Sequence, residues 1–335
     1  MNTRRTLAAA LAAAAVLTVV LLDAGEPMPA EANQGATNPN RVTTAVGPAP
    51  AESTTAAVVQ QPPAACDPRA SLRPAAPLPV PGQMPADSTM ARIAERGRLI
   101  AGVDQNTYLF GFRDPDTGRL DGFDIEIVRD IAGAIFDDRE RVEFRPVNIV
   151  DRIPIVERAD NDVDIVVSTL TISCERRARV EFSGVYLEAG QRVLVNRGTS
   201  VTGLDGLGGK RVCAARGSTS LRNILIAPSE PEPVGVPNAT DCLVLLQLGE
   251  VDAVSTDDTL LAGLAAQDPR TEIVGPRFTE EPYGVAVNRE DPDLVRFVNA
   301  VLERRVADGT WLASYQRWLT PLGPAPAPPA LRYRD

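Results

Sequence analysis

Strand and helix patterns alternate along most of this chain, and that order constrains its fold more than any other feature. Apolar runs at 99–103 and 163–167 indicate short buried strands, and the stretches between such runs have helical periodicity. The longest expected helix covers 293–318. Because helices connect parallel strands across the faces of a sheet, the order predicts an α/β fold with mainly parallel sheets. Ligands of such folds bind beyond the carboxyl ends of the strands.

Proline-rich segments lie on both sides of this body. Residues 33–88 are mainly Pro, Ala, Thr and Gln without periodicity, which predicts an extended linker. Residues 321–335 form a shorter proline-rich tail. The folded body is therefore expected over about 89–320.

Residues 1–32 have the pattern of an export signal. Arg4 and Arg5 precede an apolar run over 6–22, and Ala30-Glu31-Ala32 resembles a signal-peptidase site. The run is also long enough for an uncleaved membrane anchor, so both alternatives stay open. Residues 22–25 lack the cysteine of a bacterial lipobox. Either way, we expect the body outside the cytoplasm, secreted or anchored by its N-terminal segment.

Composition excludes much of the common catalytic chemistry. The chain has 335 residues, a net charge of −10, no histidine and a single lysine, Lys210. Without histidine it has no Ser-His-Asp triad, no Cys-His dyad and no imidazole metal site. The acidic balance argues against a nucleic-acid partner. We therefore expect no cofactor, no metal site and no enzymatic activity.

The four cysteines fit an oxidising compartment. Cys213 lies in a strand pattern and Cys242 in a helix pattern that follows it, which favours a Cys213–Cys242 disulfide and leaves Cys66 to pair with Cys174. Three pairings are possible, and buried free thiols are the alternative. A zinc site is not expected, because no two cysteines have C-x-x-C spacing.

Polar residues gather at four expected strand ends. Hydroxyl groups and free backbone N–H groups at helix starts suit a carboxylate, an arginine can bind a carboxylate with two hydrogen bonds, and an aspartate complements an ammonium group. The pattern therefore predicts a site for an amino-acid zwitterion. The candidate residues are Asp104, Tyr108 and Phe110; Ser168, Thr169, Thr171 and Arg176; Arg216, Ser218 and Thr219; and Asp257.

Each candidate also has a purely structural interpretation. Ser218 and Asp257 are suited to cap helices, Arg176 to form a solvated charge pair with Arg177, and Tyr108 and Phe110 to pack in a core. No single residue decides between the two interpretations. Their order along the chain favours the binding site.

Several longer stretches resemble one family. They are 122–127, 164–177, 180–183, 217–219, 252–257 and 309–318. Over about 97–319 the chain is similar to the extracytoplasmic solute-binding proteins of bacterial ABC importers for polar amino acids, particularly the actinobacterial glutamine- and glutamate-binding branch. The resemblance implies a two-lobed periplasmic-binding-protein fold of type II, with a hinge between the lobes. Lobe 1 would comprise 89–192 with 285–320, and lobe 2 would comprise 193–284.

The resemblance also implies roles for the candidates. Arg176 would bind the ligand α-carboxylate with help from Ser168, Thr169 and Thr171, and Asp257 would bind the α-ammonium group. It further implies that Ser218 and Thr219 help to bind carboxylates and that Tyr108 or Phe110 stacks on the ligand. Asp104 would contact the side-chain end of the ligand. The sequence departs from the family at Arg216, with Arg222 following, which favours glutamate or aspartate over glutamine or asparagine unless both arginines face solvent.

Three functions are compatible with these features. The first is a monomeric amino-acid receptor that delivers its ligand to the membrane permease of an ABC importer. The second is a receptor that reports the amino acid to a membrane sensor. The third, more remote, is a periplasmic dehydratase, for which Asp104 and Glu126 are the available carboxylates.

Overall fold

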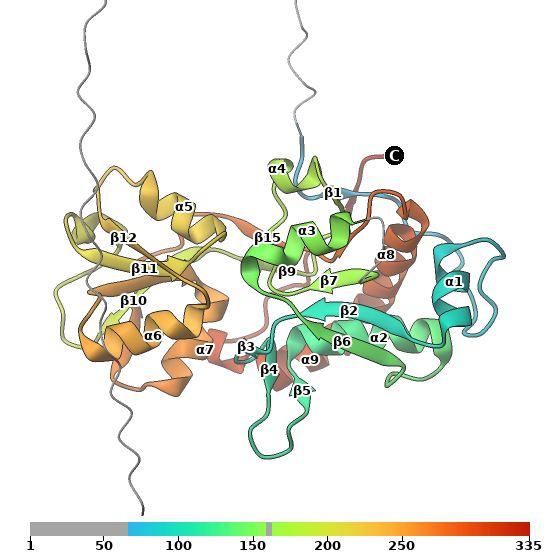
Figure 1. The fold of residues 1–335 in the computed structure, drawn as a ribbon, viewed down its shortest axis with the longest axis horizontal. Coiled ribbons are helices and arrows are strands. Elements are labelled where there is room, and N and C mark those ends of the chain that lie inside the picture. Colours follow the sequence, from blue (N-terminus) through green and yellow to red (C-terminus); the bar gives the residue numbers. More distant parts are fainter. Residues whose placement is uncertain (1–65, 159–162) are drawn as a thin grey trace, which may run out of the picture. The chain divides into compact units, whose positions relative to one another are not determined.

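The computed structural model describes residues 66–158 and 163–335. The expected export signal and the expected linker up to residue 65 lie outside the described residues. Within the described part, no helix is both long and apolar enough to cross a membrane. The described residues form two lobes, each with its own five-stranded sheet (Figure 1).

Lobe 1 contains a sheet with strand order β6-β2-β7-β16-β8. The first three strands are parallel, and β16 is antiparallel to both of its neighbours. Every residue of β2 is buried, as the continuous apolar run predicts for a central parallel strand. The strands are β6 (Val142–Pro146), β2 (Leu99–Val103), β7 (Ile165–Val167), β16 (Ala286–Val287) and β8 (Glu181–Phe182).

Helices flank this sheet, and they pack through the apolar faces that the sequence periodicity predicts. The expected helix over 293–318 is two helices, because Gly309 adopts a left-handed conformation (φ 84°) that interrupts α-helical geometry. The helices are α1 (Thr89–Arg96), α2 (Phe123–Phe136), α3 (Arg152–Glu157), α4 (Cys174–Arg177), α8 (Pro292–Ala307) and α9 (Thr310–Trp318). A small sheet joins β3 (Asn106–Thr107), β4 (Gly111–Arg113) and β5 (Leu120–Asp121). Short 3-10 helices are η1 (Ile149–Asp151) and η3 (Thr320–Leu322).

Lobe 2 contains a sheet with strand order β12-β11-β13-β10-β14. Its strands are β12 (Glu232–Val236), β11 (Arg211–Ala215), β13 (Ala253–Asp257), β10 (Gln191–Asn196) and β14 (Thr271–Val274). Its helices are α5 (Thr219–Leu225), α6 (Ala239–Leu248) and α7 (Asp258–Gln267), with the 3-10 helix η2 (Leu204–Leu207). The expected Cys213–Cys242 disulfide is confirmed: it joins β11 to α6 in the buried core, with 5.5 Å between the Cα atoms.

Two antiparallel strands connect the lobes. The chain leaves lobe 1 through β9 (Leu187–Ala189) and returns through β15 (Glu281–Tyr283), and these strands pair with each other. When two lobes move as rigid bodies, the segments that connect them absorb the change in backbone angles, so this pair of strands is the candidate hinge. We call β9 and β15 the hinge strands.

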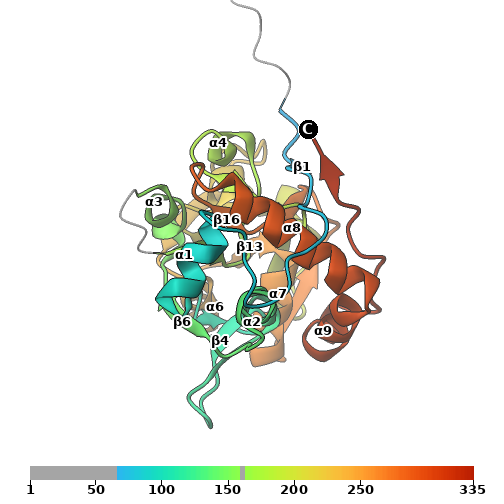
Figure 2. The same ribbon diagram turned by 90° about the vertical axis from the view of Figure 1, so that its right-hand side faces the viewer.

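The proline-rich segments expected as linker and tail are partly built into lobe 1. β1 (Ala70–Ser71) pairs in parallel with β17 (Arg332–Tyr333), and Figure 2 shows this pair beside α8, near the C-terminus. Asn299 of α8 donates hydrogen bonds to Ser71 Oγ (2.9 Å) and to the Leu72 carbonyl (2.6 Å). The expected Cys66–Cys174 disulfide is also confirmed. Such docking uses backbone pairing and a crosslink, which leave no periodicity in the sequence.

Candidate functional site

Residues from both lobes line one small cavity at the ends of the strands. From lobe 1 come Asp104, Thr107, Ile149, Arg152, Thr169, Thr171 and Arg176; from lobe 2 come Ala215, Ser218, Thr219, Ser220, Thr256, Asp257 and Leu260. The free volume is about 20 Å³, room for about one water molecule. An amino acid can therefore enter only when the lobes move apart.

Arg176 reaches this cavity from α4, the single helical turn that follows β7. Ser173 caps the turn by accepting a hydrogen bond from the Arg176 backbone N–H (3.2 Å), which sets the direction of the arginine. The guanidinium donates from Nη1 to the Thr171 carbonyl (2.7 Å) and from Nη2 to the Gly217 carbonyl of lobe 2 (3.4 Å). Burial lowers its pKa to about 10, with Arg152 adding repulsion. It stays cationic at neutral pH.

A second arginine, Arg152 at the start of α3, lines the same cavity. It is only 5% exposed, and it donates to the carbonyls of Ser168 (2.7 Å) and Ile149 (3.2 Å). Among the described residues it forms no ion pair, and burial lowers its pKa. A buried guanidinium without a carboxylate partner is costly, so an anion placed in the cavity would be stabilised. Sequence reasoning missed Arg152, because one arginine in a helical pattern is ordinary and only the fold turns it inward.

Asp124 of α2 holds the loop that follows β7. Its carboxylate accepts hydrogen bonds from the Thr169 backbone N–H (2.7 Å) and the Tyr186 hydroxyl (2.9 Å). Thr169 has a φ of 41°, which is uncommon for a non-glycine residue, and this buried contact supports it. Burial raises the pKa of Asp124 to about 7, although both hydrogen bonds oppose the shift.

Lobe 2 contributes Asp257, the last residue of β13. The Tyr283 hydroxyl donates to its Oδ2 (2.5 Å), and Ser220 Oγ lies 3.4 Å from its Oδ1. Burial, together with the nearby carboxylate of Glu281, raises the pKa of Asp257 to about 7. A bound ammonium group would offset that repulsion.

The hydroxyl groups of lobe 2 are already used within the protein. Ser218 Oγ accepts from the Leu221 backbone N–H (3.0 Å) and donates to the Ala215 carbonyl (2.6 Å), so it caps α5. Thr219 Oγ1 donates to the buried carboxylate of Glu281 (2.8 Å). Both residues line the cavity in addition to these structural roles.

Four expected site residues do not line this cavity. Phe110 is completely buried in the core, edge-on to Phe123 and Tyr283, and Tyr108 is 39% exposed beside Phe112. Ser168 is buried, and only its carbonyl faces an arginine of the site. Arg216 is exposed. In the loop after β2 the apolar phenylalanine side chain turns into the core, which leaves Asp104 at the cavity.

Asp104 lies at the cavity, as expected, and closes a turn there. Its carboxylate accepts from the Asn106 backbone N–H (2.7 Å) and from Thr107 Oγ1 (2.9 Å). Arg222 is exposed and pairs with Glu175 of lobe 1 (2.6 Å). The two arginines that favoured an acidic ligand in the sequence, Arg216 and Arg222, are therefore exposed, and the arginines that line the cavity are Arg152 and Arg176.

Comparison with known proteins agrees with this geometry. Residues 99–321 match the family described as bacterial extracellular solute-binding proteins, family 3. The glutamine-binding protein GlnH of an ABC transporter in Bacillus subtilis is 36% identical over 232 residues, covering 69% of this chain and 84% of that protein. The glutamate-binding protein GluB of Corynebacterium glutamicum is 30% identical over 248 residues, covering 70% of this chain and 81% of its own length.

Solved structures show the same two-lobed fold. An ancestral arginine-binding protein bound to glutamine is 34% identical, with a TM-score of 0.61, and the match covers 67% of this chain and 98% of that one. The matched family and these relatives are named as solute-binding proteins. This chain belongs to the bacterial extracellular solute-binding proteins of family 3.

Proposed function

We propose that this chain is an extracytoplasmic receptor for a polar amino acid, which closes over its ligand and delivers it to an ABC importer. The observation that carries the proposal is the division of charge across the cavity. Arg152 and Arg176 lie on lobe 1 and Asp257 lies on lobe 2. An amino-acid zwitterion carries a carboxylate for the arginines and an ammonium group for the aspartate, so it would join the two walls. Relatives named as glutamine- and glutamate-binding proteins support this ligand class.

Within this class, the second arginine favours glutamate or aspartate over glutamine or asparagine. One guanidinium is sufficient for the α-carboxylate, and the other, Arg152, forms no ion pair among the described residues, although Asp104 and Asp257 act on it electrostatically. A ligand with a side-chain carboxylate would supply that partner.

Closure by hinge motion would give the importer a surface that exists only in the liganded state. The finer assignments belong to the same proposal. The protein acts as a monomer, and its N-terminal segment directs it out of the cytoplasm, where it is either secreted or anchored to the membrane by that segment. In the competing proposal, the closed receptor reports the amino acid to a membrane sensor and does not deliver it to a permease.

The ligand is identified by thermal unfolding of the purified chain with each of the twenty amino acids. A ligand that binds only the folded state adds about 2.7 kcal/mol of stability at a hundredfold excess over its dissociation constant. We expect the largest shifts for glutamate and aspartate. The receptor proposal fails if no amino acid raises the midpoint.

The variant Arg152→Gln tests the preference for an acidic ligand. We expect it to weaken glutamate binding about tenfold more than glutamine binding, because an amide does not need a second cation. Unfolding without ligand serves as the control for loss of the carbonyl contacts of Arg152. Equal losses for both ligands would leave the receptor intact and contradict the role of Arg152.

A further inference from the structure

The N-terminal arm contacts both hinge strands through one arginine. Arg69 donates from Nε and Nη2 to the two carboxylate oxygens of Glu188 on β9, at 3.0 and 2.9 Å. Its third nitrogen, Nη1, lies 3.1 Å from the carboxylate of Glu280, the residue directly before β15. The guanidinium therefore bridges the outgoing and the returning connection between the lobes.

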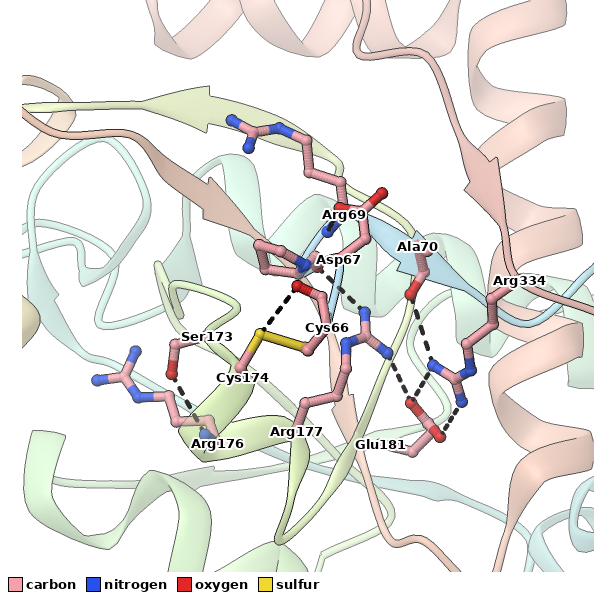
Figure 3. Close-up of a disulfide and its surroundings, with 11 residues drawn as sticks. Cys66, Asp67, Arg69, Ala70, Ser173, Cys174, Arg176, Arg177, Glu181 and Arg334 are labelled. Carbon is pink, nitrogen blue, oxygen red and sulfur yellow. Dashed lines mark hydrogen bonds and ion pairs between the residues drawn. A yellow bond between two sulfur atoms is a disulfide. The ribbon is translucent and has the colours of Figure 1, made fainter. Parts of the chain in front are cut away.

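The same short segment is attached to the helix that carries Arg176. Cys66 is crosslinked to Cys174, the first residue of α4, and Arg177 of α4 donates to the Pro68 carbonyl (3.2 Å) (Figure 3). Arg177 also pairs with Glu181 (2.8 Å). We call Cys66–Arg69 the arm clasp.

The arm clasp is held to lobe 1 from its other side as well. β1 begins at Ala70, directly after Arg69, and pairs with β17. Ser71 is completely buried and donates from Oγ to the Phe182 carbonyl (2.7 Å). The backbone of Arg69 is thus fixed between a disulfide and a strand pairing. Little further conformational entropy is lost when its side chain binds the hinge strands.

We propose that Arg69 is a positioning residue for ligand binding: it holds the hinge strands in the geometry of the closed cleft, and the Cys66–Cys174 disulfide keeps it in place. This inference rests on the proposed function. Opening the lobes changes backbone angles in the crossing strands, which separates or rotates Glu188 and Glu280. Bonds made best in the closed form raise its population and thus the apparent affinity.

The test measures lobe closure and ligand affinity in the same variants. Fluorophores are attached through unnatural amino acids at two exposed positions, Leu312 on α9 and Leu248 on α6, so that the disulfides are left intact. We expect Arg69→Ala to lower energy transfer in the ligand-free and the half-saturated protein. Glutamate affinity should fall about three- to tenfold, through faster dissociation.

Three further variants separate positioning from general destabilisation. Arg69→Lys should restore part of the affinity, because an ammonium group keeps one of the two contacts. Glu280→Ala removes one partner, which is 80% exposed, and should reproduce a smaller part of the loss. Arg119→Ala is the matched control, since it breaks an exposed pair with Glu140 (3.4 Å) elsewhere on lobe 1.

The outcome separates this inference from the proposed function. If Arg69→Ala and Glu280→Ala match Arg119→Ala in energy transfer and in affinity, the role of Arg69 is contradicted. If the wild-type chain binds no amino acid, the proposed function fails. Energy transfer in the ligand-free variants still decides whether Arg69 biases the hinge.

Discussion

The arginines on the lobe 1 wall of the cleft and Asp257 on the lobe 2 wall carry opposite charges, and the protein holds the two kinds of group in different ways. On lobe 1, Arg152 and Arg176 are oriented by backbone carbonyls, so both guanidinium groups stay cationic and available to an anion. On lobe 2, Asp257 is held by the Tyr283 hydroxyl beside a second carboxylate, Glu281, and its pKa is raised to about 7. Lobe 1 thus offers a permanent charge, and lobe 2 offers one that depends on pH and on the ligand.

We expect the largest effect from Arg176 on the lobe 1 wall. Arg176→Ala should weaken binding of the preferred amino acid by about thirtyfold or more, because it leaves a buried ligand carboxylate without its partner. Isothermal titration calorimetry measures the loss, with Arg119→Ala, which breaks an exposed ion pair elsewhere on lobe 1, as the control. A loss below threefold would show that α4 does not carry the carboxylate site.

We expect a smaller effect from Asp257 on the lobe 2 wall. Asp257→Asn keeps the shape of the side chain and removes the charge, and we expect binding to weaken about tenfold, the low end of the range for a hydrogen bond to a charged group. The same titrations measure it. Equal affinity for the variant and the wild type would move the ammonium site elsewhere on lobe 2.

Binding should also depend on pH through Asp257. The ammonium group requires the ionised carboxylate, whose pKa in the ligand-free protein is about 7. Affinity should therefore fall as pH drops below 7, by at most about tenfold per unit. Titrations between pH 5 and 8 check this, and Asp257→Asn should flatten the profile. Asp124 titrates in the same range on lobe 1, so a slope that persists in the variant would point to that carboxyl.

The raised pKa of Asp257 affects folding stability in the direction opposite to its effect on ligand affinity. A carboxyl with a higher pKa in the folded state than in the unfolded chain binds its proton more tightly when folded. The contribution of Asp257 to stability should therefore increase as pH falls from about 7 toward 4, while ligand affinity decreases. Urea unfolding of the ligand-free wild type and Asp257→Asn across this range separates the two trends.

The smallest effect is expected at the mouth of the cleft. Arg222 pairs with Glu175 across the lobes, but both side chains are more than half exposed, so Arg222→Ala should change affinity at most about fivefold. Arg216→Ala should leave the choice between glutamate and glutamine unchanged, because Arg216 faces solvent. Competition titrations with glutamate and glutamine test this. A reversed preference would show that Arg216 and Arg222 contribute to the choice of ligand.

Local patterns were sufficient for much of the site. Asp104, Thr169, Arg176 and Asp257 lie at or after the ends of buried strands, and a sheet brings such strand ends together. Phe110 shows the limit of that reasoning. It lies in the same loop as Asp104, yet its aromatic ring gains more from the core around Phe123 than from the cavity.

The sequence by itself predicted the α/β class, the buried strands near 99–103 and 163–167, the favoured disulfide pairing, and seven of the residues that line the cavity. These follow from periodicity, residue chemistry and order along the chain. Only the tertiary structure decided that Arg152 lines the cavity, that Arg216 does not, and that Arg69 reaches the hinge. The physical reason is that burial and pairing of a long charged side chain depend on elements distant in sequence, as the 119 residues between Arg69 and Glu188 illustrate.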